Sequence, residues 1–209
     1  MNRPQRIRNL VLPGALALLV TGCLPKPHTL ATRSYLLSPV SPARTPGTTA
    51  APAQPTLGIG IVQMPSYLLK PSLAVRSGSN EVRYLEASLW AERLDTSFQR
   101  TLAANLASLL PTDQIRISSW SRDEVVRAVY VNVEQFDVDA RGTGTLAAWW
   151  RITNPSGDKT LRSGEFRSTQ PGPPPSEDPG AVASTLSTLT TRLSEQLAAT
   201  LRESLAATP

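Results

Sequence analysis

The sequence predicts an α+β domain in which two amphipathic helices pack on one face of a mainly antiparallel β-sheet. Segments with the two-residue alternation of a strand occur in groups, separated by short turns rich in glycine, asparagine and serine. Two longer segments instead repeat leucine at spacings of three and four residues, which is the period of an α-helix. A helix with a single apolar stripe must cover another element, and a sheet with one apolar face is the surface it needs.

The domain begins with three short strands. Residues 57–63 alternate apolar side chains with glycine, which predicts the first of them. Residues 72–76 and 81–85 flank a Ser-Gly-Ser-Asn sequence that favours a tight turn, so these two segments are expected to form a β-hairpin.

The first helix is expected at residues 88–110. Ser88 is placed to cap its start, and Pro111 ends it because proline cannot continue a helix. The apolar stripe of this helix consists of Trp90, Leu94, Phe98, Leu102, Leu106 and Leu109.

A run of strands follows. Residues 115–118 predict a short strand, and residues 129–138 a long one whose alternation shifts phase near its middle, as a β-bulge would produce. Turns rich in glycine, asparagine and proline connect it to strands at residues 145–153 and 160–169. This part of the sheet is therefore expected to be an antiparallel meander with one packed and one more exposed face.

The last helix begins near Asp178, which can cap it, and Pro179, which suits a first helical turn. Its stripe consists of Val182, Leu186, Leu189, Leu193, Leu197, Leu201 and Leu205. Together these elements predict one domain at residues 57–209.

The first 22 residues are interpreted as a lipoprotein signal peptide. Three arginines and no acid precede an apolar stretch at residues 10–20, which is too short to span a bilayer. Small residues then lead directly into Cys23, the only cysteine of the chain. We expect cleavage between Gly22 and Cys23, with a diacylglycerol on the sulfur and an acyl chain on the new amino terminus.

Such a modification would hold the mature chain on a membrane, because each buried methylene group contributes about 0.8 kcal/mol. The alternative is a free, buried or disulfide-linked cysteine behind an ordinary signal peptide. Residues 23–56 are expected to contain the lipidated terminus, a short strand near Tyr35 and a proline-rich tether. That tether is either a semi-stiff spacer between membrane and domain or an unstructured connector.

Charge argues against nucleic acid as a partner. The whole chain carries a net charge of +5, but residues 1–22 hold three arginines and no acid, so the mature chain carries only +2. No run of lysine or arginine forms a stripe that could follow phosphates.

We expect no enzymatic activity, metal or further cofactor. The only histidine, His28, lies in the predicted tether, which excludes a Ser-His-Asp arrangement and a zinc site built from Cys and His. Gly58-Ile59-Gly60 lacks the third glycine of a dinucleotide loop and indicates close backbone approach or an irregular strand. A carboxylate pair stays formally possible, although solvated faces are the simpler interpretation of Glu92, Asp95, Glu134, Asp137 and Asp139.

Two features predict a partner-binding surface. Tyr67, Leu68 and Leu69 form an apolar triplet in a proline-bounded segment too short for a core helix. Trp149 and Trp150 are adjacent on a strand and therefore point to opposite faces, so one of them should lie outside the core. An exposed tryptophan is a common anchor for a partner, and partial burial under a helix is the alternative. Trp90 is the sixth candidate residue for partner binding.

The order of several segments resembles the ABC-type transport auxiliary lipoprotein family, which includes the PqiC (YmbA) lipoproteins. These segments are the lipobox at residues 20–23, Tyr35-Leu36-Leu37, residues 60–68, residues 89–94 with Trp90, Asn105-Leu106, the valine-rich strand ending in Phe136 and the leucine-striped last helix. The resemblance covers essentially all of the mature chain. The proline-rich insert at residues 38–56 and the loop at residues 171–175 depart from the family pattern.

The resemblance implies a non-enzymatic outer-membrane lipoprotein of an intermembrane lipid transport system that supports membrane integrity. Its implied partner is a periplasm-spanning protein with mammalian-cell-entry (MCE) domains, docked at the periplasmic leaflet by a ring-forming homo-oligomer. Leu24 stands where an aspartate would retain a lipoprotein at the inner membrane, which favours outer-membrane sorting. Two other functions stay open: a periplasmic lipid carrier, and a pilotin or chaperone for an outer-membrane assembly.

Overall fold

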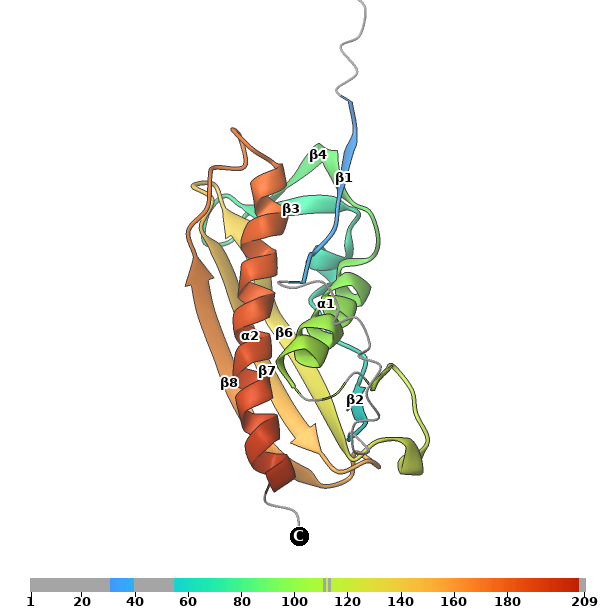
Figure 1. Ribbon diagram of the computed structural model, residues 1–209. Helices are drawn as coiled ribbons and strands as arrows, with labels where there is room; N and C mark the ends of the chain where they lie inside the picture. The colour runs from blue at the N-terminus through green and yellow to red at the C-terminus, as the bar shows by residue number, and fades with distance from the viewer. Residues whose placement is uncertain (1–30, 40–54, 111, 113, 207–209) are drawn as a thin grey trace, which may run out of the picture. The chain divides into compact units, whose positions relative to one another are not determined.

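A sheet and two long helices make up the computed structural model, which describes residues 31–39, 55–110, 112 and 114–206 (Figure 1). The strands are β1 (Arg33–Tyr35), β2 (Leu57–Ile59), β3 (Ser72–Arg76), β4 (Val82–Trp90), β5 (Ile115–Ile117), β6 (Arg127–Asp139), β7 (Gly144–Thr153) and β8 (Thr160–Gln170). The helices are α1 (Leu94–Leu109) and α2 (Gly180–Ala206), with two short 3₁₀ helices, η1 (Ser66–Leu69) and η2 (Arg122–Glu124).

The central strand of the sheet is β6. One of its edges pairs with β7, which in turn pairs with β8, and both pairings are antiparallel. Its other edge pairs in parallel with β2 near Ala128 and with β3 near Val138. The β3–β4 hairpin is antiparallel, while β1 joins β4 and β5 joins β2 in parallel.

The sheet is therefore mixed, which corrects the expectation of a mainly antiparallel sheet. Strands that follow one another through a tight turn must run in opposite directions, and the predicted hairpin and the predicted meander do so. The parallel pairs join segments that are far apart in the sequence. Local alternation reports only that a segment is a strand, so these partners and their direction were not predictable from it.

A β-bulge interrupts β6 and confirms the predicted shift of phase. Val133 pairs with Ala148, and the next partner pair is Gln135 with Ala147, so Glu134 is the extra residue. The bulge keeps Val131, Val133 and Phe136 all buried even though their spacing is uneven.

The start of α1 differs from the prediction. Ser88 and Trp90 belong to the end of β4, and the helix begins only at Leu94. The backbone of this segment is engaged in the sheet: Ser88 and Trp90 pair with β1, and Trp90 N–H donates to the Pro71 carbonyl at 2.7 Å. Trp90 continues the helical stripe by coincidence, because a buried strand end also selects a large apolar residue.

Both helices lie on the same face of the sheet and pack against each other, as predicted (Figure 1). Phe98 of α1 meets Phe136 of β6 edge to face, with ring centroids 5.1 Å apart. Between the helices, Asn105 Nδ2 donates to Ser194 Oγ at 3.2 Å. Asp178 caps α2 as expected, since its Oδ1 accepts from Gly180 N–H at 2.8 Å.

The segment that follows β1 is part of the same core. Leu37 is buried, and the Ser38 backbone N–H donates to Ser187 Oγ of α2 at 3.0 Å. The Leu37 carbonyl accepts a long hydrogen bond of 3.5 Å from Thr101 Oγ1 of α1. The chain is thus attached to both helices before residue 40.

Candidate functional site

The structure separates the six residues that the sequence marked for partner binding. Leu68, Trp90 and Trp150 are buried, and Tyr67 and Leu69 are half-buried. Trp149 keeps 50% of its surface exposed. Among the six, Trp149 therefore has the most surface available to another molecule.

The two adjacent tryptophans point to opposite faces of the sheet, which confirms the expectation that one lies outside the core. Trp150 is 7% exposed and packs over Gly164 of β8, where an added Cβ would lie 2.7 Å from Trp150 Cζ2. Trp149 emerges on the opposite face, away from the helices. The burial difference follows from the alternation of side chains along β7.

A groove of about 290 Å³ lies beside Trp149 on this outer face. Its floor is β6 around Asn132, which pairs with Trp149 on one side and with Gln63 on the other. Trp149 and Arg151 form one wall. Ile61, which is 68% exposed, lies with Gln63 on the opposite wall.

The charges on this face are separated. Trp149 Nε1 donates to Glu134 Oε1 at 2.8 Å, which fixes the indole beside an acid. The Arg151 guanidinium stacks over the Tyr130 ring, 4.5 Å from its centroid. Among the described residues, no carboxylate lies within ion-pair distance of Arg151, so its charge is available at the other end of the wall.

Two glycines let aromatic rings lie directly on β2 and the residue that follows it. A Cβ on Gly58 would lie 2.8 Å from Trp120 Cε2, and a Cβ on Gly60 would overlap the Tyr130 ring. The Trp120 and Tyr130 rings are themselves neighbours, with centroids 6.3 Å apart. Close backbone approach, one of the two expected reasons for Gly58-Ile59-Gly60, is confirmed.

A buried polar cluster attaches η1 to the sheet. Asp137 is 1% exposed and accepts from Tyr67 Oη at 2.8 Å, Arg76 Nη2 at 2.7 Å and Gln135 Nε2 at 2.9 Å. Burial, together with the Asp137 charge and hydrogen bond, raises the pKa of Tyr67 above its ordinary value.

The prediction that Asp137 lies on a solvated face is wrong. Tyr67 and Arg76 come from distant segments and bind the carboxylate, a tertiary arrangement that strand alternation does not report. The carboxylate oxygens of Asp137 accept hydrogen bonds from three donors. A structural role therefore explains why this acid is buried.

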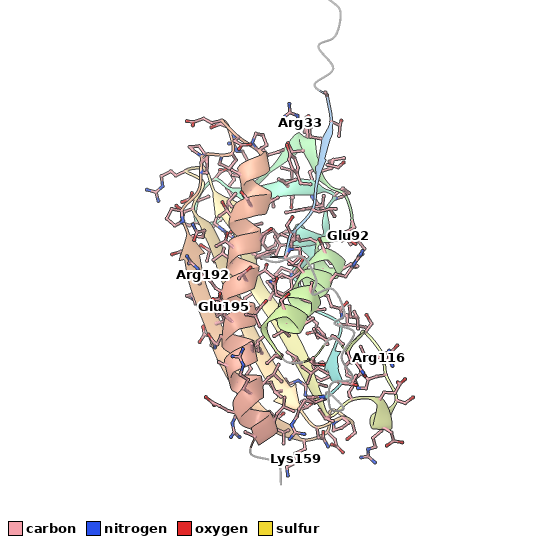
Figure 2. The ribbon with its side chains drawn as sticks, viewed as in Figure 1. Arg33, Glu92, Arg116, Lys159, Arg192 and Glu195 are labelled. Atoms are coloured by element: carbon pink, nitrogen blue, oxygen red, sulfur yellow. The ribbon has the colours of Figure 1, made fainter. Side chains whose placement is uncertain are left out.

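The outward-facing charges are spread over the molecule (Figure 2). No group of three or more His, Cys, Asp or Glu side chains in the described ranges could hold a metal ion. In that same part of the chain, neither helix is long and apolar enough to cross a membrane. The predicted cleavage site at Gly22, the predicted lipidation site at Cys23 and His28 lie outside the described residues.

Solved structures share this fold at low sequence identity. An uncharacterised protein whose crystal structure is known is 20% identical, with a TM-score of 0.59 over 81% of this chain and 99% of its own. A Xanthomonas campestris protein of the DUF330 family is 14% identical, with a TM-score of 0.56 over 80% of this chain and 91% of its own. No curated protein matches the sequence.

The family comparison covers most of the chain. The model described as the ABC-type transport auxiliary lipoprotein component matches residues 35–198, which extend from the end of β1 into the last turns of α2. This range includes the groove beside Trp149 and the polar cluster around Asp137. The chain belongs to the family of ABC-type transport auxiliary lipoprotein components.

Proposed function

We propose that this chain is a lipid-anchored, non-enzymatic subunit that docks a periplasm-spanning MCE-domain conduit at the periplasmic leaflet of the outer membrane. Membership in the family of ABC-type transport auxiliary lipoprotein components supports a role as a transporter subunit. The observation that carries the docking role is Trp149, a half-exposed tryptophan on a sheet face that neither helix covers.

The proposed anchor is Cys23, which would carry the diacylglycerol and the amide-linked acyl chain. Among the described residues, the first strand begins at Arg33 of β1, ten residues after Cys23. Ten residues span at most about 35 Å when fully extended, and this length limits how far β1 can lie from the proposed anchor. In Figure 2, Arg33 and Lys159 mark opposite ends of the domain, so β1 lies at the end opposite the β7–β8 turn.

The proposed assembly is a homo-oligomer that encircles or caps the end of the conduit. This part of the proposal follows from the resemblance of the sequence to the family, which implies a ring-forming homo-oligomer. Outer-membrane sorting is supported by Leu24, because the residue after the lipidated cysteine is not an aspartate. The partners are thus the outer-membrane leaflet and an MCE-domain protein, without nucleic acid.

Purification of the full-length chain from the membranes of its own bacterium tests the docking role. We expect an MCE-domain protein to co-purify, and Trp149→Ala to lower its recovery about tenfold or more, as loss of a central tryptophan anchor does. Leu36→Ala is the matched control and should leave recovery unchanged, since Leu36 is 51% exposed and lies beside residues of α1 and α2. Recovery of only an outer-membrane β-barrel would favour the pilotin function instead.

The anchor is tested separately by cell fractionation and mass spectrometry. The natural chain should sediment with outer membrane and carry acyl groups at Cys23, and Cys23→Ser should appear in the soluble fraction. A natural product that is soluble and has an unmodified amino terminus would contradict the proposal.

A further inference from the structure

We propose that the groove between Ile61 and Trp149 receives an extended polypeptide segment of the partner, which places an apolar side chain against Trp149 and a carboxylate, two residues away, on Arg151. This inference rests on the proposed docking function and specifies the chemistry of the partner. Ile61, Trp149 and Arg151 are the residues that carry it.

The geometry of the groove follows from the strand register. Gln63, Asn132 and Trp149 form one row across the outer face, and Tyr130 and Arg151 form the next row. Trp149 and Arg151 lie two residues apart on one face of β7, about 6.6 Å along the strand. An extended peptide repeats its side chains at the same interval, so alternate residues of one segment can meet both.

The size of the groove favours a side chain over a lipid. Pockets for drug-sized molecules have volumes of about 300–1,000 Å³. A groove of about 290 Å³ accommodates one large apolar side chain between Trp149 and Ile61, whereas a phospholipid with two acyl chains needs several times that space.

Charge sets the position of the carboxylate. Arg151 is held over the Tyr130 ring and has no acid within ion-pair distance among the residues described. A carboxylate of the partner can accept hydrogen bonds from the Arg151 guanidinium in this position. The resulting ion pair would lie at the solvent-exposed rim of the groove. Glu134, bound to the Trp149 indole, repels an acid at the other end of the wall. The segment must therefore present its carboxylate toward Arg151.

Photo-crosslinking of the full-length chain in its own bacterium tests this inference. Ser163 lines the groove and is exposed, so p-benzoylphenylalanine in its place leaves Trp149 and Arg151 intact. We expect an adduct with a polypeptide whose crosslinked peptide carries a large apolar residue and an Asp or Glu two positions away. Arg151→Glu and Ile61→Gln should each lower the adduct yield about tenfold or more.

Two controls keep the result interpretable. Arg116→Glu changes an exposed arginine of β5 and should leave the yield unchanged. The test variant Ile61→Gln changes a side chain that is 68% exposed and is expected to leave the fold intact. A thermal unfolding curve identical to that of the parent chain shows that Arg151→Glu also folds.

An adduct with phospholipid, an adduct with a second copy of this chain, or no adduct would overturn the inference. So would a polypeptide adduct whose yield is insensitive to Arg151→Glu. If the adduct contains an MCE-domain protein but its yield does not depend on Arg151, the proposed function is supported and the proposed chemistry of the groove is wrong. If the adduct contains a protein without MCE domains, its crosslinked peptide has the expected apolar and acidic residues two positions apart, and its yield depends on Arg151, the proposed chemistry of the groove is supported and the proposed function is wrong.

Discussion

Trp149 and Trp150 differ in burial because they are consecutive residues of one strand. Trp150→Ala empties a core position and should lower the free energy of unfolding by about 3–5 kcal/mol. Trp149→Ala removes a half-exposed ring and should cost about 1 kcal/mol or less. Denaturant unfolding of the two variants measures both, and similar losses would contradict the assignment of their faces.

Gly60 has no room for a side chain. Gly60→Ala puts a Cβ into the Tyr130 ring, which also stacks with the Arg151 guanidinium, and should destabilise the domain by about 1–3 kcal/mol. Gly78 is the matched control, because a Cβ there meets nothing within 4 Å. Gly78→Ala should be neutral or stabilising by up to about 1 kcal/mol in the same unfolding assay.

Tyr67 should make stability depend on alkaline pH. Burial and the Asp137 carboxylate raise its pKa in the folded chain above the ordinary value of 10.0. The unfolded chain therefore loses this proton first, so the contribution of Tyr67 is complete below pH 10 and falls as the pH rises above it. Tyr67→Phe lacks the titrating group but also loses a hydrogen bond to a charged acceptor, which costs about 1.5–3 kcal/mol at neutral pH.

The measurement is the free energy of unfolding of the parent and of Tyr67→Phe between pH 7 and pH 11. Their difference should be constant up to about pH 9 and shrink above pH 10. Two curves that stay parallel over the whole range would show that the Tyr67 hydroxyl is not coupled to Asp137 in solution.

The boundary between β4 and α1 shows how neighbouring strands decide the state of an element. Residues 88–90 satisfy a helical stripe, yet β1 and the Pro71 carbonyl bind their backbone in the sheet. The described residues at the start of α2 do not belong to a strand, so the Asp178 cap determines where this helix begins. Local helix propensity therefore determines where a helix begins only where no distant segment forms hydrogen bonds with the same backbone.

The cap of α2 can be tested directly. Asp178→Ala removes the acceptor of the Gly180 N–H and should lower the free energy of unfolding by about 0.5–2 kcal/mol. Glu177→Ala changes the preceding exposed acid and serves as the control, with an expected effect within about 0.5 kcal/mol. Equal effects of both variants would indicate that charge near the helix terminus matters more than the hydrogen bond.

The segment next to the proposed anchor is integrated into the whole molecule. Leu37 is 6% exposed, whereas its neighbour Leu36 is 51% exposed. Leu37→Ala should lower the free energy of unfolding by about 2–5 kcal/mol, and Leu36→Ala should change it by less than about 0.5 kcal/mol. Indistinguishable unfolding curves for the two variants would mean that this segment is a tether in solution.

Local patterns predicted the class of the fold, the β6 bulge, the cap of α2 and the opposite orientations of Trp149 and Trp150. Each of these depends on residues within a few positions of one another, where side-chain period and turn chemistry act. Contacts between distant segments determine three other features: the burial of Asp137, the end of β4 at Trp90 and the parallel partners of β6.

The same distinction applies to the candidate site. Trp149 was identified from the sequence because two adjacent tryptophans on a strand cannot both face the core. Ile61 and Arg151 carried no comparable signal, since an isolated isoleucine and a strand arginine are ordinary. Only the folded chain brings them together, because the strand pairing places the β2 segment beside β6 and so makes the opposite wall of the groove.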